Sequence, residues 1–260
     1  MTAATEFAAK LRGHEVLVGY WIVMDSPTST ERLARVGYDY LCIDQQHGLL
    51  GYEGIRNGLM ATDAGARLGG VDTVGLVRAA ANDLTWIGQA LDAGACGIIV
   101  PLVSSAADAE TAVRNVRYAP HGIRSYGPMR SQLRVGPLPA EANDSNLVIV
   151  MIETAEGLAN VEEIAAVPGI DALYVGPSDL ALAVGAAYPG DPAVAEVFAE
   201  ALESVKAAAK KAGIPAGIHA PSGEIAAQRI SEGFTFSSIA SDIVHLEQVA
   251  AGHLAAAQKR

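Results

Sequence analysis

The chain has 260 residues, of which half are apolar, and a formal net charge of −11. This length suits one α/β barrel with a sizeable core, and the scattered basic residues exclude an extended nucleic-acid surface. No run of about 18 apolar residues suggests a membrane span. The first residues lack a signal-peptide pattern, so we expect a cytoplasmic protein. Cys42 falls in an expected strand and Cys96 at the start of another, and both are interpreted as reduced core residues, with a disulfide as the alternative.

Short β-type runs alternate with helical patterns along the whole chain, which is typical of βα units on a parallel sheet. Several runs are nearly continuous in apolar residues, as in strands buried on both faces. No strand is followed by a GxGxxG turn, so the pattern favours a single (β/α)8 TIM barrel domain over residues 1–260 rather than a doubly wound sheet. The eight expected strands are residues 16–23, 40–45, 73–79, 97–103, 147–153, 172–176, 214–220 and 234–240, the last being the weakest.

Between the strands, helices are expected at residues 29–37, 84–94, 106–117 and 192–213, several of them followed by a glycine that ends the helix. Residues 118–146 form a connection too long for an ordinary barrel loop, and such loops are usually functional or interfacial. A final helix is expected at residues 242–259. Its broad apolar face exceeds what the outer ring of a barrel buries, which predicts a homo-oligomer with this helix at a subunit interface. That face comprises Ile243, Val244, Leu246, Val249, Ala250 and Leu254.

Reactive groups of an α/β barrel lie where its strands end. Glu153 follows the fifth strand and Asp179 the sixth, so the two carboxylates can converge on one hard cation such as Mg²⁺ or Mn²⁺. The alternative is that Glu153 is a surface-edge carboxylate and Asp179 caps the next helix. The turn formed by Gly176, Pro177, Ser178 and Asp179 can also present backbone N–H groups to an anion.

Arg78 ends the third strand, where an unpaired buried cation would be costly. Its planar fork suits a carboxylate or an enolate oxygen, although a structural ion pair explains it equally well. After the second strand, His47 and Asp44 could form a proton-transfer pair, and a purely structural histidine is the alternative. His219 ends the seventh strand without an assigned role.

Longer motifs around these residues resemble the HpcH/HpaI aldolase family, the metal-dependent pyruvate aldolases that include 4-hydroxy-2-oxoheptanedioate aldolase. The similarity runs nearly end to end, and the last of its segments is highly specific because the glutamate and aspartate keep their family context. The segments are GYDYLCIDQQHG (37–48), LVRAAANDLTWIGQALDAGACGIIVPLV (76–103), VRYAPHGIRSYGP (116–128) and VIVMIETAEGLANVEEIAAVPGIDALYVGPSDLALAVG (148–185).

The resemblance implies a barrel of the phosphoenolpyruvate/pyruvate type, assembled as a hexamer, often with its last helix packed on a neighbour. It implies that Glu153 and Asp179 bind a divalent metal (Mg²⁺, Mn²⁺ or Co²⁺) and that a pyruvate-type 2-oxo acid chelates that metal. The carboxylate of the acid would also meet the backbone N–H groups of Ser178 and Asp179, and Arg78 would hold the oxygen that becomes an enolate.

For the second substrate, the resemblance implies that His47, with Asp44, relays a proton near the aldehyde oxygen. Asp92, in the helix after the third strand, matches a family carboxylate near the site and is expected there as a catalytic residue. These implied roles complete the candidate catalytic set.

Three departures from the family pattern affect the expected site. Gln45 and Gln46 stand where the family usually has Gly-Glu, which removes one negative charge beside the proposed relay. Met151 replaces a common glutamine, so one hydrogen bond to substrate can be absent. Residues 124–127 read RSYG where many relatives have RGxG, in a loop that lies over the family's site, which leaves the aldehyde preference open.

The function implied is reversible aldol cleavage and addition between pyruvate or hydroxypyruvate and an aldehyde through a metal-stabilised enolate. No expected strand ends in lysine, which argues against an imine-forming aldolase. The base is open, with metal-activated water aided by His47 preferred. The alternatives are a CoA-ester lyase of the citramalyl or malyl type, for which no basic cluster is evident, and a non-catalytic 2-oxo-acid-binding protein.

Overall fold

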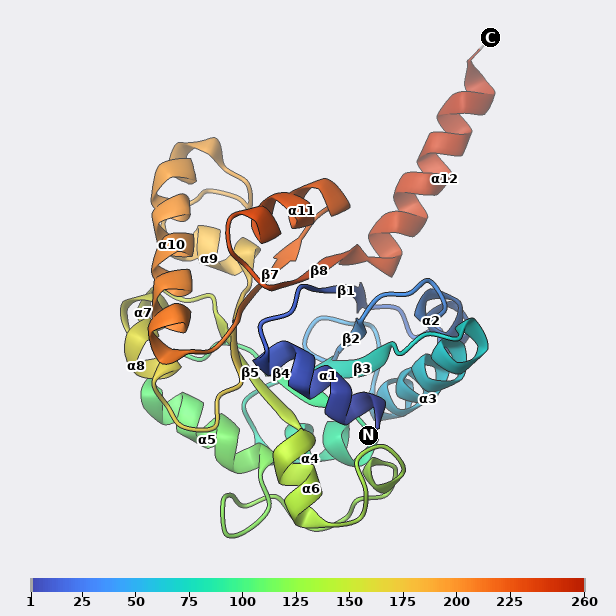
Figure 1. Cartoon of the computed structure of the whole chain (residues 1–260). Helices are drawn as coiled ribbons and strands as arrows, with labels where there is room; N and C mark the ends of the chain where they lie inside the picture. The colour runs from blue at the N-terminus through green and yellow to red at the C-terminus, as the bar shows by residue number, and fades with distance from the viewer. Residues whose placement is uncertain (1, 260) are drawn as a thin grey trace.

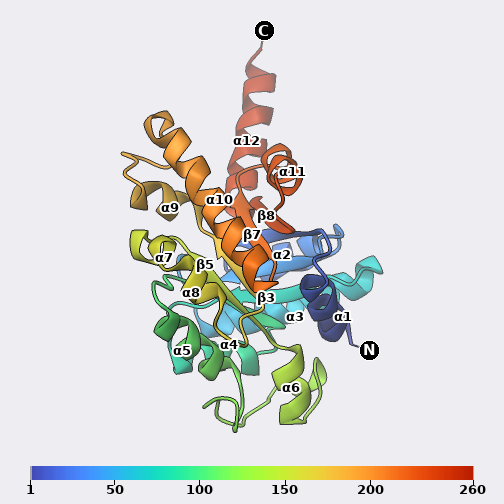
Figure 2. The same cartoon turned by 60° about the vertical axis from the view of Figure 1, so that its left-hand side comes forward.

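The computed structural model describes residues 2–259, which form a closed barrel of eight parallel strands (Figures 1 and 2). Each strand pairs with the next along the chain, and the last pairs with the first to close the sheet. All eight strands match the runs expected from the sequence, so the predicted (β/α)8 fold is confirmed. The strands are β1 (Leu17–Ile22), β2 (Tyr40–Asp44), β3 (Val74–Arg78), β4 (Gly97–Val100), β5 (Leu147–Ile152), β6 (Ala172–Val175), β7 (Ala216–Ala220) and β8 (Phe236–Ser241).

A helix follows every strand, and most of these helices begin and end on residues suited to the position. Asp83, Ser105 and Ser222 accept hydrogen bonds from backbone N–H groups in the first turns of α4, α5 and α11. Gly70 and Gly213 end α3 and α10 in the left-handed conformation. The helices after the strands are α2 (Pro27–Ala34), α3 (Tyr52–Gly69), α4 (Leu84–Asp92), α5 (Ala106–Val116), α7 (Ala155–Ala159), α8 (Val161–Ala165), α9 (Pro177–Ala183), α10 (Ala195–Ala212), α11 (Gly223–Ser231) and α12 (Asp242–Gln258).

Two further segments add to the barrel. The start of the chain folds as α1 (Ala3–Arg12), whose buried Phe7 packs on Tyr40 with ring centroids 5.8 Å apart. The long connection 118–146 contains a 3-10 turn at Ser131–Leu133 and the short helix α6 (Pro139–Ser145). None of the helices in the described part of the chain has the length and apolar character needed to cross a bilayer.

Large and small residues alternate inside the barrel and give the site its floor. The ring of Tyr40 lies so close to Gly19 that a Cβ there would be 2.2 Å from it, and Phe236 fills the space beside Gly217 in the same way. Above them, the rings of Trp21 and Tyr174 stack at 6.0 Å. This filled interior leaves space for a ligand only at the ends of the strands.

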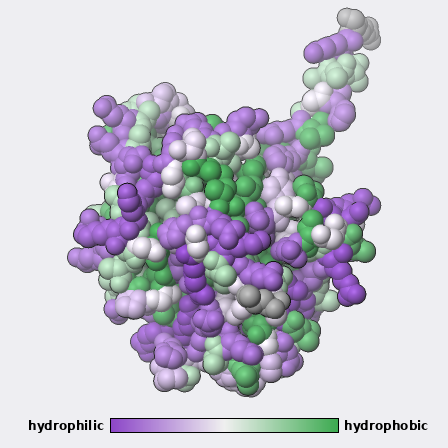
Figure 3. All heavy atoms as spheres, viewed as in Figure 1, coloured by the Kyte–Doolittle hydropathy of each residue, from purple (hydrophilic) through white to green (hydrophobic). Residues whose placement is uncertain are grey.

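The last helix, α12, stands clear of the barrel in both views and in the space-filling view (Figures 1, 2 and 3). Its base is anchored by the buried carboxylate of Asp242, which accepts hydrogen bonds from the backbone N–H groups of Val23, Met24 and Ile243 at 3.0 to 3.2 Å. Beyond this base its apolar side chains are exposed, with Leu246 and Val249 each 59% accessible.

Candidate functional site

A pocket of 190 Å³ opens at the carboxyl ends of the strands and collects most of the side chains that the sequence singles out. This volume is below the ~300–1,000 Å³ of sites for drug-sized ligands, so the pocket suits a small molecule. It is lined by Trp21, His47, Arg78, Met151, Glu153, Gly176, Pro177, Ser178, Asp179 and His219.

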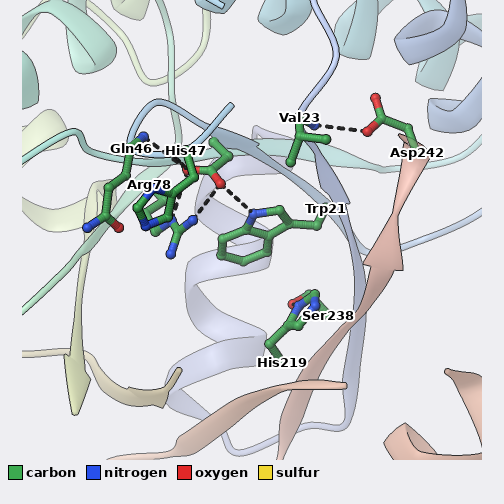
Figure 4. A network of polar contacts seen from close by, with 9 residues as sticks. Trp21, Val23, Gln46, His47, Arg78, His219, Ser238 and Asp242 are labelled. Carbon is green, nitrogen blue, oxygen red and sulfur yellow. Dashed lines mark hydrogen bonds and ion pairs between the residues drawn. The ribbon is translucent and has the colours of Figure 1, made fainter. Parts of the chain in front are cut away.

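Arg78 is buried and held from one side by Asp44. Its Nε and Nη2 atoms donate to the two carboxylate oxygens of Asp44 at 2.9 and 2.5 Å, and Trp21 Nε1 donates to the same carboxylate at 3.1 Å (Figure 4). Burial alone would raise the pKa of Asp44, but the hydrogen bonds and the charge of Arg78 outweigh it and hold that pKa below its usual value. The structural ion pair considered as the alternative role of Arg78 therefore exists, and it leaves the rest of the guanidinium facing the pocket.

The structure does not join the His47 ring to Asp44 by a hydrogen bond within residues 2–259, so their proton-transfer pairing stays a prediction. Asp44 Oδ1 accepts hydrogen bonds from the backbone N–H groups of Gln46 and His47 at 3.0 and 3.2 Å, so it shapes the turn that carries the histidine. His47 itself is exposed at the edge of the pocket, where a substrate can reach it.

Glu153 and Asp179 lie at neighbouring strand ends beside the pocket. Glu153 Oε1 accepts the backbone N–H of Leu102 at 2.8 Å, whereas Oε2 is buried without a hydrogen-bond partner in the described chain. Burial, followed by the nearby charge of Asp179, raises the pKa of Glu153. An unpartnered buried carboxylate oxygen beside a second carboxylate fits the donor set of a hard divalent cation.

The alternative roles set out for this pair do not hold. Glu153 is almost fully buried, with 2% of its surface accessible, and is therefore not an ordinary surface carboxylate. Gly176 is the N-cap of α9, so Asp179 lies inside the first turn rather than capping it. Gly176 also leaves room for the glutamate, because a Cβ at this position would lie 2.2 Å from Glu153 Oε2.

Two of the departures from the family pattern lie at or next to the pocket. Met151 is buried and lines the pocket, so it presents a thioether where the family offers an amide. Both side-chain polar atoms of Gln45 are buried without a hydrogen-bond partner within residues 2–259. The side-chain oxygen Oε1 of Gln46 is likewise buried and has no partner there. Neither glutamine lines the pocket, so their effect on substrate must pass through the turn before His47.

Asp92 does not lie with the other predicted catalytic residues of the chain. It ends α4, which runs back toward the start of β4, and the site is at the opposite end of the strands. Its carboxylate accepts a hydrogen bond from Arg124 Nη2 at 2.8 Å and so ties the 118–146 connection to α4. Within one chain, its expected place near the site is therefore wrong.

Two pocket residues were not assigned a role from the sequence. Trp21 lies between Arg78 and His219, with the guanidinium carbon 5.1 Å from its ring centroid and the imidazole centroid at 5.3 Å (Figure 4). Burial, followed by the positive charge of Arg78, lowers the pKa of His219 to about 4. The polar end of the seventh strand was a visible signal for His219, whereas Trp21 sits inside an apolar run and gave none.

A barrel that brings two carboxylates, a buried arginine and an accessible histidine to its strand ends has the groups needed to stabilise an enolate and move a proton. The family model for HpcH/HpaI aldolase/citrate lyase matches residues 17–248. The chain belongs to this family.

Individual relatives cover nearly the whole chain. The hydroxypyruvate/pyruvate aldolase of Rhizorhabdus wittichii is 39% identical over 239 residues, which are 92% of either chain. The 5-keto-4-deoxy-D-glucarate aldolase of Klebsiella pneumoniae subsp. pneumoniae is 36% identical over 92% of this chain and 91% of that one. The crystal structure of an HpcH/HpaI aldolase/citrate lyase family protein from Burkholderia cenocepacia has a TM-score of 0.87 and 32% identity, and covers 98% of this chain and 100% of that one. The chain is accordingly a carbon–carbon lyase of the aldolase type.

Proposed function

We propose that the chain catalyses reversible aldol cleavage and addition between a pyruvate-type 2-oxo acid and an aldehyde, through an enolate of the acid. The observation that carries this proposal is the convergence of Arg78, Glu153 and Asp179 on one small pocket. The R. wittichii relative is named for hydroxypyruvate and pyruvate, which supports this class of donor.

A divalent cation is the cofactor that fits the acidic side of this pocket. Glu153 and Asp179 would hold it, and no described cluster of three or more histidine, cysteine or acidic side chains offers an all-protein alternative. Two carboxylates leave positions open for substrate, as in Mg²⁺ and Mn²⁺ sites, and Co²⁺ is the third candidate. The bound cation would supply positive charge that stabilises the oxygen of the enolate.

The protein groups then have separate tasks. Arg78, held rigidly by Asp44, donates to the C2 oxygen of the acid and stabilises the negative charge that develops there. The backbone N–H groups of Ser178 and Asp179, in the first turn of α9, bind the carboxylate. His47, at the open edge of the pocket, gives a proton to the new alkoxide in addition and removes it in cleavage.

Assembly through the last helix accompanies this proposal. The exposed apolar residues of α12, including Leu246, Val249 and Leu254, are 59 to 60% accessible in the isolated chain. Such a face on a protruding helix favours a subunit contact, and we take a hexamer as the assembly.

The cysteines are both free and buried, as expected from the sequence, and suit the reducing cytoplasm that we propose as the location.

The deciding experiment is a turnover assay with purified protein, a divalent salt, pyruvate or hydroxypyruvate, and a set of simple aldehydes. We expect aldol products that are cleaved again by the same enzyme. Turnover of citramalyl- or malyl-CoA without aldol activity would instead indicate a CoA-ester lyase. Binding of 2-oxo acids without turnover of any substrate would indicate a binding protein.

A further inference from the structure

His219 ends β7 and lines the pocket, but the proposed aldol steps do not use it. Its ring packs against the edge of Trp21, and Trp21 in turn packs on the guanidinium of Arg78. The imidazole therefore lies across Trp21 from Arg78, and also away from His47, which lies beside Arg78 (Figure 4).

A line of hydrogen bonds from the barrel interior ends at Nδ1 of His219, and the direction in which its members donate decides which ring nitrogen carries the proton. Ser238 Oγ lies 2.9 Å from His219 Nδ1, and the hydroxyl of the fully buried Tyr174 contacts the same serine oxygen. We assign the phenol as the donor to the serine, and the serine hydroxyl then donates to Nδ1. A neutral ring that accepts at Nδ1 carries its hydrogen on Nε2, which is then a hydrogen-bond donor.

The ring is neutral under ordinary conditions. Burial first, and then the charge of Arg78, lower the pKa of His219 to about 4, so near neutral pH it holds a single ring proton. A neutral donor beside the substrate does not compete with the cationic guanidinium for the enolate oxygen. It is suited to a neutral oxygen, such as a hydroxyl group.

The place of the third carbon of the donor follows from the proposed contacts. The cation ligands Glu153 and Asp179 follow β5 and β6, and Arg78 ends β3, so the C1 and C2 oxygens face this half of the barrel. The C3 substituent then faces the opposite half, where β1 and β7 contribute Trp21 and His219. This side of the pocket is otherwise aromatic.

We propose that His219 is a specificity-determining residue, which donates a hydrogen bond from Nε2 to a hydroxyl group on C3 of the donor. The preferred donor is then a 3-hydroxylated 2-oxo acid of the hydroxypyruvate type rather than pyruvate. This inference rests on the proposed aldolase function. Its physical basis is that pyruvate, which lacks the hydroxyl, leaves a desolvated donor unpaired, and sites built for a hydroxyl discriminate strongly against such analogues.

The test measures proton exchange at C3 of each donor in deuterated water, with the metal-loaded enzyme and no aldehyde, and compares kcat/KM for hydroxypyruvate and pyruvate. The wild type should favour hydroxypyruvate. His219→Leu should lower kcat/KM for hydroxypyruvate by roughly 10- to 100-fold, as expected for one lost hydrogen bond with a buried partner, and leave pyruvate within about threefold. His219→Gln, which keeps a side-chain N–H donor, should retain part of the preference.

The serine behind the ring offers a second variant with a matched control. Ser238→Ala removes the hydroxyl that donates to Nδ1 and so keeps the proton of the ring on Nε2. The variant should weaken the preference for hydroxypyruvate while the imidazole itself stays in place. Ser237→Ala, on the same strand, removes a buried hydroxyl that donates to the carbonyl of Ile218 at 2.9 Å, whereas the hydrogen bond to the His219 ring comes from Ser238. Ser237→Ala should leave the ratio of kcat/KM for the two donors unchanged. A change of this ratio in Ser238→Ala alone then reflects the ring of His219 and not a loss of stability common to both variants.

Three outcomes overturn the inference. If folded His219→Leu keeps the wild-type ratio of kcat/KM for hydroxypyruvate and pyruvate, no hydrogen bond joins His219 to the C3 hydroxyl. A wild type that prefers pyruvate would lead to the same conclusion. Equal loss of exchange with both donors would show that His219 serves the proton transfer itself. If the wild type exchanges neither donor and forms no aldol product, the proposed function fails, which is distinct from a failure of the role given to His219.

Discussion

Arg78 and Asp44 face each other as residue partners on the paired strands β3 and β2, and their side chains form two parallel hydrogen bonds in a buried position. One edge of the guanidinium is bound to Asp44 by this pairing, and the other edge faces the pocket. It also determines what each substitution at the two positions should do.

Arg78→Lys should therefore fail to replace the arginine, because an ammonium group cannot span the carboxylate and reach substrate together. We expect Arg78→Ala and Arg78→Lys to lose roughly 10²–10³ in exchange at C3 of the donor, the scale of a lost oxyanion donor. Asp44→Asn should lower the same exchange, since it frees the guanidinium to move. If exchange survives in Asp44→Asn while aldol addition is lost, Asp44 serves His47 after all.

Removal of the metal should abolish activity, and Mg²⁺, Mn²⁺ or Co²⁺ should restore it. Glu153→Ala and Asp179→Ala should lose metal binding, measured by calorimetry, with an unchanged circular dichroism spectrum. Glu156→Ala is the matched control, because this exposed glutamate lies in the adjacent helix α7, away from the pocket lining. Full activity after exhaustive chelation would contradict the assignment.

His47→Ala should separate proton transfer at the aldehyde from formation of the enolate. We expect aldol cleavage to fall by roughly 10²–10⁴, the usual contribution of a general acid–base, while pyruvate binding stays near the wild-type level and exchange at C3, where His47 only assists a water, falls less. The pH–rate profile of cleavage, wild type against variant, is the measurement. Near-normal turnover with an unchanged profile would make His47 structural and assign the proton to a water chain.

Stability should depend on pH through His219. Its pKa is about 4 in the fold, below the ordinary 6.5, so between these values the unfolded chain binds the proton and the folded chain does not. The free energy of unfolding should thus fall as the pH drops from about 6.5 to 4, by roughly 2–3 kcal/mol at 1.36 kcal/mol per pKa unit. Urea unfolding of wild type and His219→Gln across this range isolates the effect, and parallel curves would show that the histidine titrates normally.

Association should depend on the apolar face of α12. Leu246→Lys combined with Val249→Lys should shift the protein to smaller species by light scattering at micromolar concentration, because charges would be buried in the contact. Gln248→Lys, on the opposite side of the same helix, should leave the assembly unchanged. A monomeric wild type would contradict the role of this helix.

The strand positions and most of the pocket could be predicted because a barrel leaves two plain signals. Its strands are apolar on both faces, and residues such as Glu153 and Arg78 interrupt that pattern where the strands end. The partner of Asp44 could not be predicted, because it depends on the register that sets Asp44 opposite Arg78. Spacing along the chain pointed instead to His47, three residues away.

Other parts of the site depend on contacts between segments distant in the chain. The donor role inferred for His219 comes from Ser238, whose strand was the weakest in the sequence pattern, and from Tyr174 two strands away. For Asp92, the sequence identifies a family position but not the end of the barrel to which its helix returns. The structure shows which end of the barrel holds Asp92, because its carboxylate accepts a hydrogen bond from Arg124 in the 118–146 connection.

The hydrogen bonds of Asp242 fix the direction in which α12 leaves the barrel. Three backbone hydrogen bonds hold one carboxylate at the root of a helix of 17 residues, which is about 25 Å long at 1.5 Å per residue. A rotation of roughly 10° at the root would displace the far end by about 4 Å, more than half the rise of a helical turn. In the proposed assembly, the angle between neighbouring subunits would therefore be set at the closing strand of the barrel, a few residues from Trp21 in the pocket, and small changes there would alter the architecture of the assembly without touching its contact surface.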